Sequence, residues 1–438
     1  MANETLSDPG SVRHAPADAA VADAVAPLFE TLLGGDAPIR VEFWDGSSID
    51  RPRAVATLQV HSPNALRRVL WMPNDLGWAR AHLSGELDLD GDIFAALEAL
   101  RTAAAQHGPV SPRVLPTTLA AARRVGAIGP PLPPPPEEVR VHGRRHSPGR
   151  DSKVISHHYD VGNDFYALVL GPAMTYSCAR YTEPGIGLEA AQAAKHELIC
   201  RKLGLPERPG ARLLDVGCGW GSMALHAARH HGAHVVGITI STAQAELARK
   251  RAAQAGVADQ IEIRLQDYRE LGGETFDAIA SIGMSEHVGK ERLDTYFRLL
   301  HDALHPQGRL LNHAISSVGG TKIGRRSFMG RYVFPDGELI DVGDSVRSME
   351  RAGFEVRDVE SLREHYALTL RAWVANLEAG WDRAVELVGE ARAKVWRLYM
   401  AGAVVGFESN GTSIHQVLGV VPDGSGRSAM PTTRRSWG

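Results

Sequence analysis

The sequence predicts an α/β protein: a doubly wound, Rossmann-like parallel sheet preceded by a small α+β domain. Three observations predict it. Apolar, β-branched runs of strand length alternate with helical segments over residues 151–438, as parallel sheets require. The first of these runs leads directly into a glycine-rich turn and a helix. A proline-rich, basic stretch at 106–150 separates this region from the mixed elements of 1–105.

The small domain contains both kinds of element. Alternating apolar and polar residues predict strands over 39–43 and 56–60, separated by a Trp-Asp-Gly turn. Apolar residues at helical spacing predict the helices. We expect helices over 25–33, 63–70 and 79–100, the last one broken at 88–91. No reactive cluster is evident here, and two roles fit residues 1–105: lipid binding and formation of a homo-oligomer.

The stretch at 106–150 changes character. Its prolines at 129–136 predict extended polyproline, which cannot form a packed core. Basic side chains follow closely: Arg140, His142, Arg144, Arg145, His146, Arg150 and Lys153. Two interpretations stay open. The stretch is a solvated linker, or it contacts anionic lipid, where each Lys or Arg contributes about 1 kcal/mol.

The large domain alternates strands and helices. We expect strands over 212–216, 234–240, 261–265, 276–281 and 308–315, with helices over 222–231 and 242–256. This order is typical of a parallel sheet with its ligand crevice at the carboxyl ends of the strands.

Composition excludes several classes of protein. The 48 basic and 51 acidic residues give a net charge of -3, so no nucleic-acid partner is indicated. The longest apolar run, 398–407, is about half of the roughly 18 residues that a membrane-spanning helix needs. The first residues show no basic-then-apolar signal, which favours the cytoplasm. The 3 cysteines are too few for a disulfide framework.

The glycine-rich turn after 212–216 has the spacing G-x-G-x-G, starting at Gly217. A dinucleotide site has G-x-G-x-x-G, followed about 20 positions later by an acidic residue that binds the ribose. The residues after the second strand, 239–241, are Thr, Ile and Ser, so that acid is missing. The turn instead resembles motif I of the S-adenosylmethionine-dependent methyltransferases.

That resemblance implies roles for the residues around the turn. Gly217 and Gly219 would leave backbone space for the aminoacyl end of the cofactor. Asp215 would organise the turn or bind the amino group, and Gln266 or Asp267 would lie near the adenine. The implied cofactor set is completed by Tyr176, Ser177, Thr239 and Gln244.

Further segments carry a more specific resemblance. The segments HHYDVGNDFY at 157–166, MTYSC at 174–178 and SIGMSEHVG at 281–289 stand out. Shorter matches lie at 237–241, 312–315, 331–337 and 365–373. In this order they resemble the cyclopropane-fatty-acid synthase family, which includes the mycolic-acid methyltransferases, over residues 152–420. The small first domain resembles the N-terminal domain of the members that act on phospholipids.

The family resemblance implies a bicarbonate ion beside the sulfonium of the cofactor, acting as the general base. Its implied ligands are Cys178, Glu286, His313, Ile315 and Tyr366. The chemistry agrees, because methyl transfer to an unactivated alkene leaves a carbocation. A base in a dry pocket must then remove a proton without adding water. No metal ion is implied.

Apolar side chains in the final third have two interpretations. They line an acyl channel, or they form an ordinary helical core. The residues concerned are Phe328, Met329, Tyr332, Phe334, Trp373, Trp396 and Phe407.

Two products share the first chemical step. Loss of a proton from the new methyl group closes a cyclopropane, whereas a prior hydride shift gives a 10-methylene chain. The segments 358–366 and 411–418 resemble the branch that makes 10-methylene precursors of tuberculostearic acid. We therefore expect that product, with a cyclopropane synthase as the alternative. A small-molecule methyltransferase and a non-catalytic cofactor-binding protein are further alternatives.

The resemblance also implies where the protein acts and with what. The substrate would be an unsaturated phospholipid at the bilayer surface, so we expect a cytoplasmic protein associated peripherally with the inner face of the membrane. A separate reductase would convert a methylene group to a methyl branch.

Overall fold

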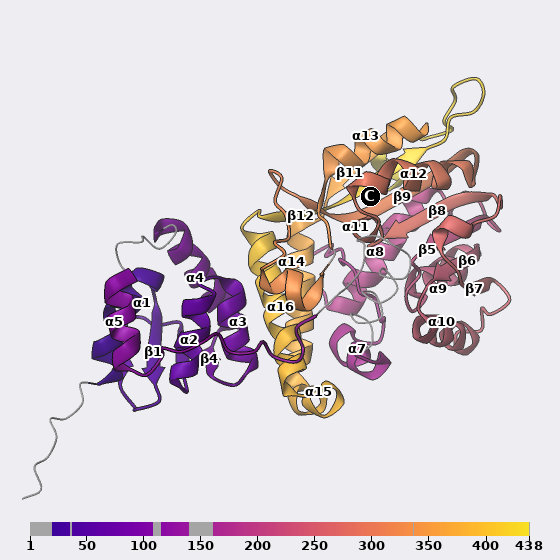
Figure 1. Cartoon of the computed structure of the whole chain (residues 1–438). Helices are drawn as coiled ribbons and strands as arrows, with labels where there is room; N and C mark the ends of the chain where they lie inside the picture. The colour runs from indigo at the N-terminus through magenta and orange to yellow at the C-terminus, as the bar shows by residue number, and fades with distance from the viewer. Residues whose placement is uncertain (1–19, 36, 108–114, 140–160, 336, 438) are drawn as a thin grey trace, which may run out of the picture. The chain divides into compact units, whose positions relative to one another are not determined.

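The computed structural model describes residues 20–35, 37–107, 115–139, 161–335 and 337–437. The chain divides into two compact units (Figure 1). Unit 1 comprises Met1–Trp71 and Gly85–Leu132, and unit 2 comprises Met72–Ser84 and Pro133–Gly438. In the described part of the chain, no helix has the length and apolar character needed to cross a membrane.

Unit 1 is built on a four-stranded sheet in the order β2-β1-β3-β4. Its strands are β1 (Ile39–Phe43), β2 (Ser48–Ile49), β3 (Ala56–Val60) and β4 (Leu87–Gly91). Strands β1 and β3 are parallel, and alternate residues of each are buried, as their sequences predict. The helices are α1 (Val21–Leu33), α2 (Pro63–Trp71), α4 (Ile93–His107) and α5 (Leu115–Arg124).

Two expectations for this region need correction. Residues 79–100 do not form one interrupted helix, because Leu87–Gly91 is β4, an antiparallel partner of β3. The sequence Leu-Asp-Leu-Asp-Gly alternates with the period of a strand, and that period decides the structure. The helix before it, α3 (Asp75–Leu83), belongs to unit 2.

The predicted linker also contains structure. Part of it forms α5, which packs against α1. The start of the proline run is held on α2, because Trp71 Nε1 donates to the carbonyl of Gly129 at 2.9 Å and Arg67 Nε donates to that of Pro130 at 2.7 Å. The basic residues from Arg140 to Lys153 lie outside the described residues.

Unit 2 contains an eight-stranded sheet, seven strands of which follow the order β11-β12-β9-β8-β5-β6-β7, with β10 pairing β9. Strands β5 to β9 are mutually parallel, which confirms the predicted doubly wound sheet. Strand β12 is antiparallel to both neighbours, β9 and β11, a feature that the sequence did not predict. The strands are β5 (Arg212–Val216), β6 (His234–Thr239), β7 (Ile261–Leu265), β8 (Phe276–Ile282), β9 (Leu304–Ser317), β10 (Ile340–Asp341), β11 (Glu355–Ser361) and β12 (Thr412–Val420).

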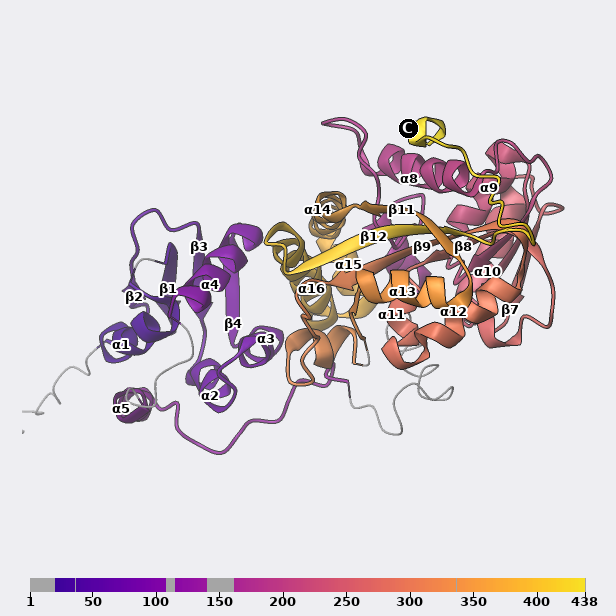
Figure 2. The ribbon, with the colours of Figure 1, turned by 90° about the horizontal axis from the view of Figure 1, so that it is seen from above.

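Helices cover both faces of this sheet. One core lies under α8 (Leu188–Leu203), α9 (Ser222–His231) and α10 (Thr242–Gln254). The other lies under α11 (Ser285–Val288), α12 (Leu293–Asp302) and α13 (Val342–Ala352). Figure 2 shows α8 and α9 on one side of the sheet and α12 and α13 on the other.

The remaining helices of unit 2 pack beside the sheet. Helix α14 contacts α7, α16 and β12. These remaining helices are α7 (Asn163–Leu170), α14 (Arg363–Ala379), α15 (Trp381–Val388) and α16 (Glu390–Glu408). Short helical turns are η2 (Tyr268–Glu270), η3 (Lys290–Arg292), the π-helical η4 (Met329–Val333) and η5 (Arg434–Ser436).

Candidate functional site

A pocket opens where β5, β6, β7 and β8 end, and the glycine-rich turn forms its floor. Gly217 and Gly219 have φ angles of 73° and 54°, a conformation that favours glycine. A Cβ at Gly217 would overlap the sulfur of Met284, whereas a Cβ at Gly219 would meet no protein atom within 4 Å. The turn therefore leaves open space above its backbone, as a closely bound ligand requires.

All the residues predicted to bind the cofactor line this one pocket, which encloses about 1250 Å³ including space open to solvent. They come from the segment before α8 and from the ends of successive strands. They are Tyr176, Ser177, Asp215, Gly217, Gly219, Thr239, Gln244, Gln266 and Asp267. Their convergence agrees with the prediction, while contact with a cofactor stays a prediction.

Asp215 is buried at the end of β5. Burial raises the pKa of its carboxyl to about 7, although the charge of Lys195 and the amide of Ala224 oppose the rise. Its Oδ2 atom has no hydrogen-bond partner among the described residues. A buried oxygen in this state is ready to accept a hydrogen bond from a ligand group.

Lys195 is a pocket residue that sequence reasoning missed. Its side chain is fully buried, and Nζ donates to Ser177 Oγ at 2.9 Å. Burial lowers the pKa of this ammonium to about 7, against the opposing effects of Cys178 and Asp215. A signal was present in α8, where Lys195 lies three residues before the buried Leu198 and so occupies a core position.

The far side of the pocket is already ordered by hydrogen bonds. Thr239 Oγ1 donates to Gln244 Oε1 at 2.9 Å. Asp267 accepts from the amide and Nε of Arg269 at 2.9 and 2.8 Å. Burial raises the pKa of Asp267, but these bonds and the charge of Arg269 hold it below its usual range. Asp267 is therefore an ionised acceptor at neutral pH.

The residues predicted to hold bicarbonate do not line that pocket; Cys178, His313 and Tyr366 are buried, whereas Glu286 and Ile315 are partly exposed. Glu286 is on α11, between Met284 and His287, both of which line the pocket. Its Oε1 accepts from the amide of Ile315 at 2.8 Å. His313 and Ile315 are alternate residues of β9 and so belong to the same face of that strand.

Three buried polar atoms in this group have no hydrogen-bond partner among the described residues: Glu286 Oε2 and both ring nitrogens of His313. Burial raises the pKa of Glu286 to about 7. Burial, with the charges of Lys195 and Lys202, lowers the pKa of His313, so its imidazole is neutral at pH 7. A neutral imidazole and a carboxyl that retains its proton can both donate hydrogen bonds to a small anion, so these residues fit the implied ion.

Cys178 connects to this group through the backbone. Its Sγ contacts the carbonyl of Leu362 at 3.7 Å, and Leu362 N donates to Ile414 O at 3.0 Å. Ile414 on β12 pairs with Ile315 on β9, whose amide binds Glu286. The structure thus brings together residues that are far apart in the sequence.

Cys178 and Tyr366 are held from α14. Leu362 O, which contacts Cys178, also accepts from the amide of Tyr366 at 3.1 Å. Burial raises the pKa of the Cys178 thiol, so the thiol stays protonated and is no nucleophile. The Tyr366 ring packs on Phe407 with centroids 4.8 Å apart.

The residues predicted to line an acyl channel are mostly buried and pack ring against ring. Tyr399 bridges them to the cofactor pocket, because its hydroxyl lies 3.1 Å from that of Tyr176 and its ring contacts Phe334 and Trp396. Both interpretations, channel and core, require such contacts, so the channel stays a prediction.

Comparison with known proteins identifies relatives over most of the chain. The family described as mycolic acid cyclopropane synthetase matches residues 146–417. A probable fatty acid methyltransferase of Mycobacterium tuberculosis is 41% identical over 418 residues, covering 92% of this chain and 95% of that protein. A tuberculostearic acid methyltransferase of the same organism is 31% identical over 422 residues, covering 92% and 91%.

Solved structures agree with the sequence relatives. A mycolic acid cyclopropane synthase complexed with SAH and CTAB is 32% identical, with a TM-score of 0.58, and covers 61% of this chain and 98% of that one. The match confirms the Rossmann-like methyltransferase fold. The chain therefore belongs to the mycolic acid cyclopropane synthetase family and is an S-adenosylmethionine-dependent methyltransferase.

Proposed function

We propose that this enzyme methylates the double bond of an unsaturated acyl chain in a membrane phospholipid and produces a 10-methylene acyl chain. Bicarbonate, held by the predicted ligands, serves as the base. The observation that carries the proposal is the set of unpartnered buried atoms of Glu286 and His313 next to the cofactor pocket. Buried polar atoms need partners, and a bound small anion would supply them here.

The first step needs a positioned methyl donor. When bound, S-adenosylmethionine supplies an electrophilic methyl group. Gly219, where a Cβ would meet no protein atom within 4 Å, leaves room for its aminoacyl end, and the ionised form of Asp215 attracts its ammonium group. Alkene electrons form the new C–C bond while the C–S bond breaks, which leaves a positive charge on the neighbouring alkene carbon.

The second step removes one proton from that cation. When bound, bicarbonate supplies an oxygen base for it. Glu286, kept close to Ile315 by a 2.8 Å hydrogen bond, orients the ion with the neutral ring of His313. Lys195 provides nearby positive charge, which favours an anion at this depth. The buried surroundings exclude water, which would otherwise add to the cation.

The 10-methylene product is favoured by the segments that resemble its branch. Residues 358–366 span the end of β11 and the start of α14, and they include Leu362 and Tyr366. Residues 411–418 lie on β12 around Ile414. Both segments contribute to the backbone connection between Cys178 and Glu286. Sequence differences in these segments would therefore change how the proposed bicarbonate base is held. The relative named tuberculostearic acid methyltransferase, similar over 91% of its length, supports the same product.

The phospholipid substrate places the enzyme at a membrane surface. The basic residues between Arg140 and Lys153 would face anionic headgroups, and we propose peripheral association on this basis. A reductase acting on the exocyclic double bond would then yield a methyl branch.

The test is the product itself. Purified enzyme is incubated with S-adenosylmethionine, bicarbonate and vesicles of dioleoyl phospholipid, and the released fatty acids are analysed by gas chromatography with mass spectrometry. We expect a gain of one CH₂ in a product that mild hydrogenation converts to a methyl-branched chain.

The other outcomes separate the alternatives. A product of the same mass that resists mild hydrogenation would make the enzyme a cyclopropane synthase. If no lipid gains mass but labelled cofactor is consumed with small molecules, the small-molecule alternative holds. If the cofactor binds and no substrate is methylated, the protein is non-catalytic.

A further inference from the structure

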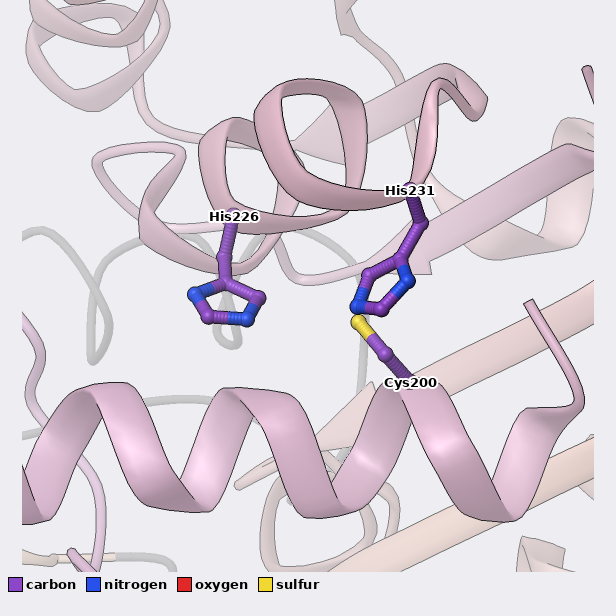
Figure 3. A group of neighbouring side chains, drawn as sticks. All are labelled: Cys200, His226 and His231. Atoms are coloured by element: carbon purple, nitrogen blue, oxygen red, sulfur yellow. The ribbon is translucent and has the colours of Figure 1, made fainter. Parts of the chain in front are cut away.

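A second cluster of reactive side chains lies between α8 and α9. Cys200 of α8 and His226 and His231 of α9 each place one donor atom within 4.8 Å of the others. Figure 3 shows both imidazole rings reaching from their helix towards the helix that carries Cys200, with the ring of His231 nearest the sulfur. None of the three lines the cofactor pocket.

A carboxylate lies beside the group. Glu197 lies one helical turn before Cys200, and its Oε2 is 3.2 Å from His226 Nε2 and 2.9 Å from His231 Nε2. Its Oε1 accepts from Arg201 Nε at 2.7 Å. Such a carboxylate orients histidine ligands through hydrogen bonds to their rings.

We propose that Cys200, His226 and His231 bind a divalent zinc ion, with Glu197 hydrogen-bonded to the two histidines. Thiolate, imidazole and carboxylate are the donors that zinc accepts in tetrahedral sites, whereas calcium and magnesium require oxygen ligands. The charges also balance, since the thiolate and the neighbouring Glu197 carboxylate offset the two positive charges of the ion.

Cys200 supplies the fully buried donor of the group. Coordination displaces the thiol proton to solvent, so zinc converts the residue from an inert thiol to a ligand. Two further histidines flank the group: the ring of buried His196 lies 5.7 Å from that of His226, and the ring of exposed His230 lies 4.5 Å from it.

The site would be structural. Helix α8 carries Lys195 into the pocket, and α9 begins immediately after Gly221, the last glycine of the turn. A metal ion joining Cys200 to His226 and His231 would fix the spacing of these two helices. Binding to the folded state alone then raises the unfolding temperature.

Cobalt is the direct probe, because tetrahedral Co²⁺ bound to a thiolate absorbs both in the near ultraviolet and in the visible. The full-length protein is stripped with a chelator and titrated with Co²⁺, and zinc is then added. We expect both bands to saturate at one ion per chain and to disappear with zinc. Zinc alone should raise the unfolding temperature of the stripped protein.

Variants assign the ligands. Cys200→Ser should abolish the near-ultraviolet band, and His231→Gln should weaken zinc binding by more than about tenfold. His234→Gln, an exposed histidine at the start of β6, should leave both measurements unchanged. Circular dichroism verifies that each variant folds. If Cys200→Ser misfolds, His231→Gln, at the end of its helix, replaces it as the test of zinc binding. Absence of a thiolate band in folded wild-type protein, or its persistence in Cys200→Ser, would overturn the proposal.

Discussion

We predict that the buried carboxyl of Asp215 makes cofactor affinity depend on pH. Its pKa of about 7 lies far above the usual value of 3.8, chiefly because burial disfavours the charged form. The neutral form, which dominates below pH 7, no longer attracts the ammonium group of the cofactor. Affinity should therefore fall as the pH is lowered through 7, and not through 4 as for an exposed aspartate.

The size of the effect follows from that pKa. We assume that only the ionised form of Asp215 binds the cofactor. Each pH unit below the pKa lowers the ionised fraction about tenfold. Relative to pH 8, cofactor affinity then falls about twofold at pH 7 and about tenfold at pH 6. Tenfold corresponds to about 1.4 kcal/mol of binding free energy.

Isothermal titration with SAH between pH 6 and pH 8 measures this dependence. The Asp215→Asn variant is the matched control, because it keeps the shape of the side chain but cannot ionise; its affinity should be weak and flat with pH. Equal affinity of the wild type at pH 6 and pH 8 would refute the reasoning. So would an Asp215→Asn variant that binds as tightly as wild type at pH 8.

Three further predictions concern the same region. Glu286→Ala should lower kcat by about 10²–10⁴-fold, because the proposed bicarbonate base loses the side chain that orients it, while SAH affinity by titration stays within a few-fold; an active variant would contradict the bicarbonate assignment. Lys195→Met removes the charge that lowers the pKa of Asp215, so the midpoint of the affinity profile should move to higher pH; an unmoved midpoint would show that the two groups are not coupled. In urea unfolding, Gly217→Ala should lower the free energy of unfolding more than Gly232→Ala does. Both glycines have positive φ, but only a Cβ at Gly217 would meet a neighbouring side chain. Equal decreases in the two variants would contradict that packing.

The sequence predicted the elements of the cofactor half well because local signals mark them. The strands at Arg212–Val216 and Ile261–Leu265 are bounded by glycine and polar turns, and their observed ends match the prediction. Leu87–Gly91 was assigned wrongly because five residues carry too weak a period to compete with the helices around them. The antiparallel insertion of β12 between β9 and β11 depends on pairing between distant segments, which no local pattern encodes.

In the candidate site, too, residues marked by local signals were predicted well, and contacts between distant segments were not. The cofactor residues follow strand ends, where topology alone brings them to one edge, and they do share one pocket. The link from Cys178 through Leu362, Ile414 and Ile315 to Glu286 joins five separate segments and appears only in the folded chain. Lys195 was missed because a charged residue in a helix is usually a solvated one.

Strand β12 lies inside the sheet but late in the sequence, so the two halves of the site are synthesised at different times. The strands and helices around the glycine-rich turn are complete once β8 has emerged, so the nucleoside half can assemble early. Strand β12 emerges last of the described strands, yet β11 reaches the rest of the sheet only through it. The segment that pairs with Ile315 and accepts a hydrogen bond from Leu362 is therefore synthesised after the elements that form most of the pocket.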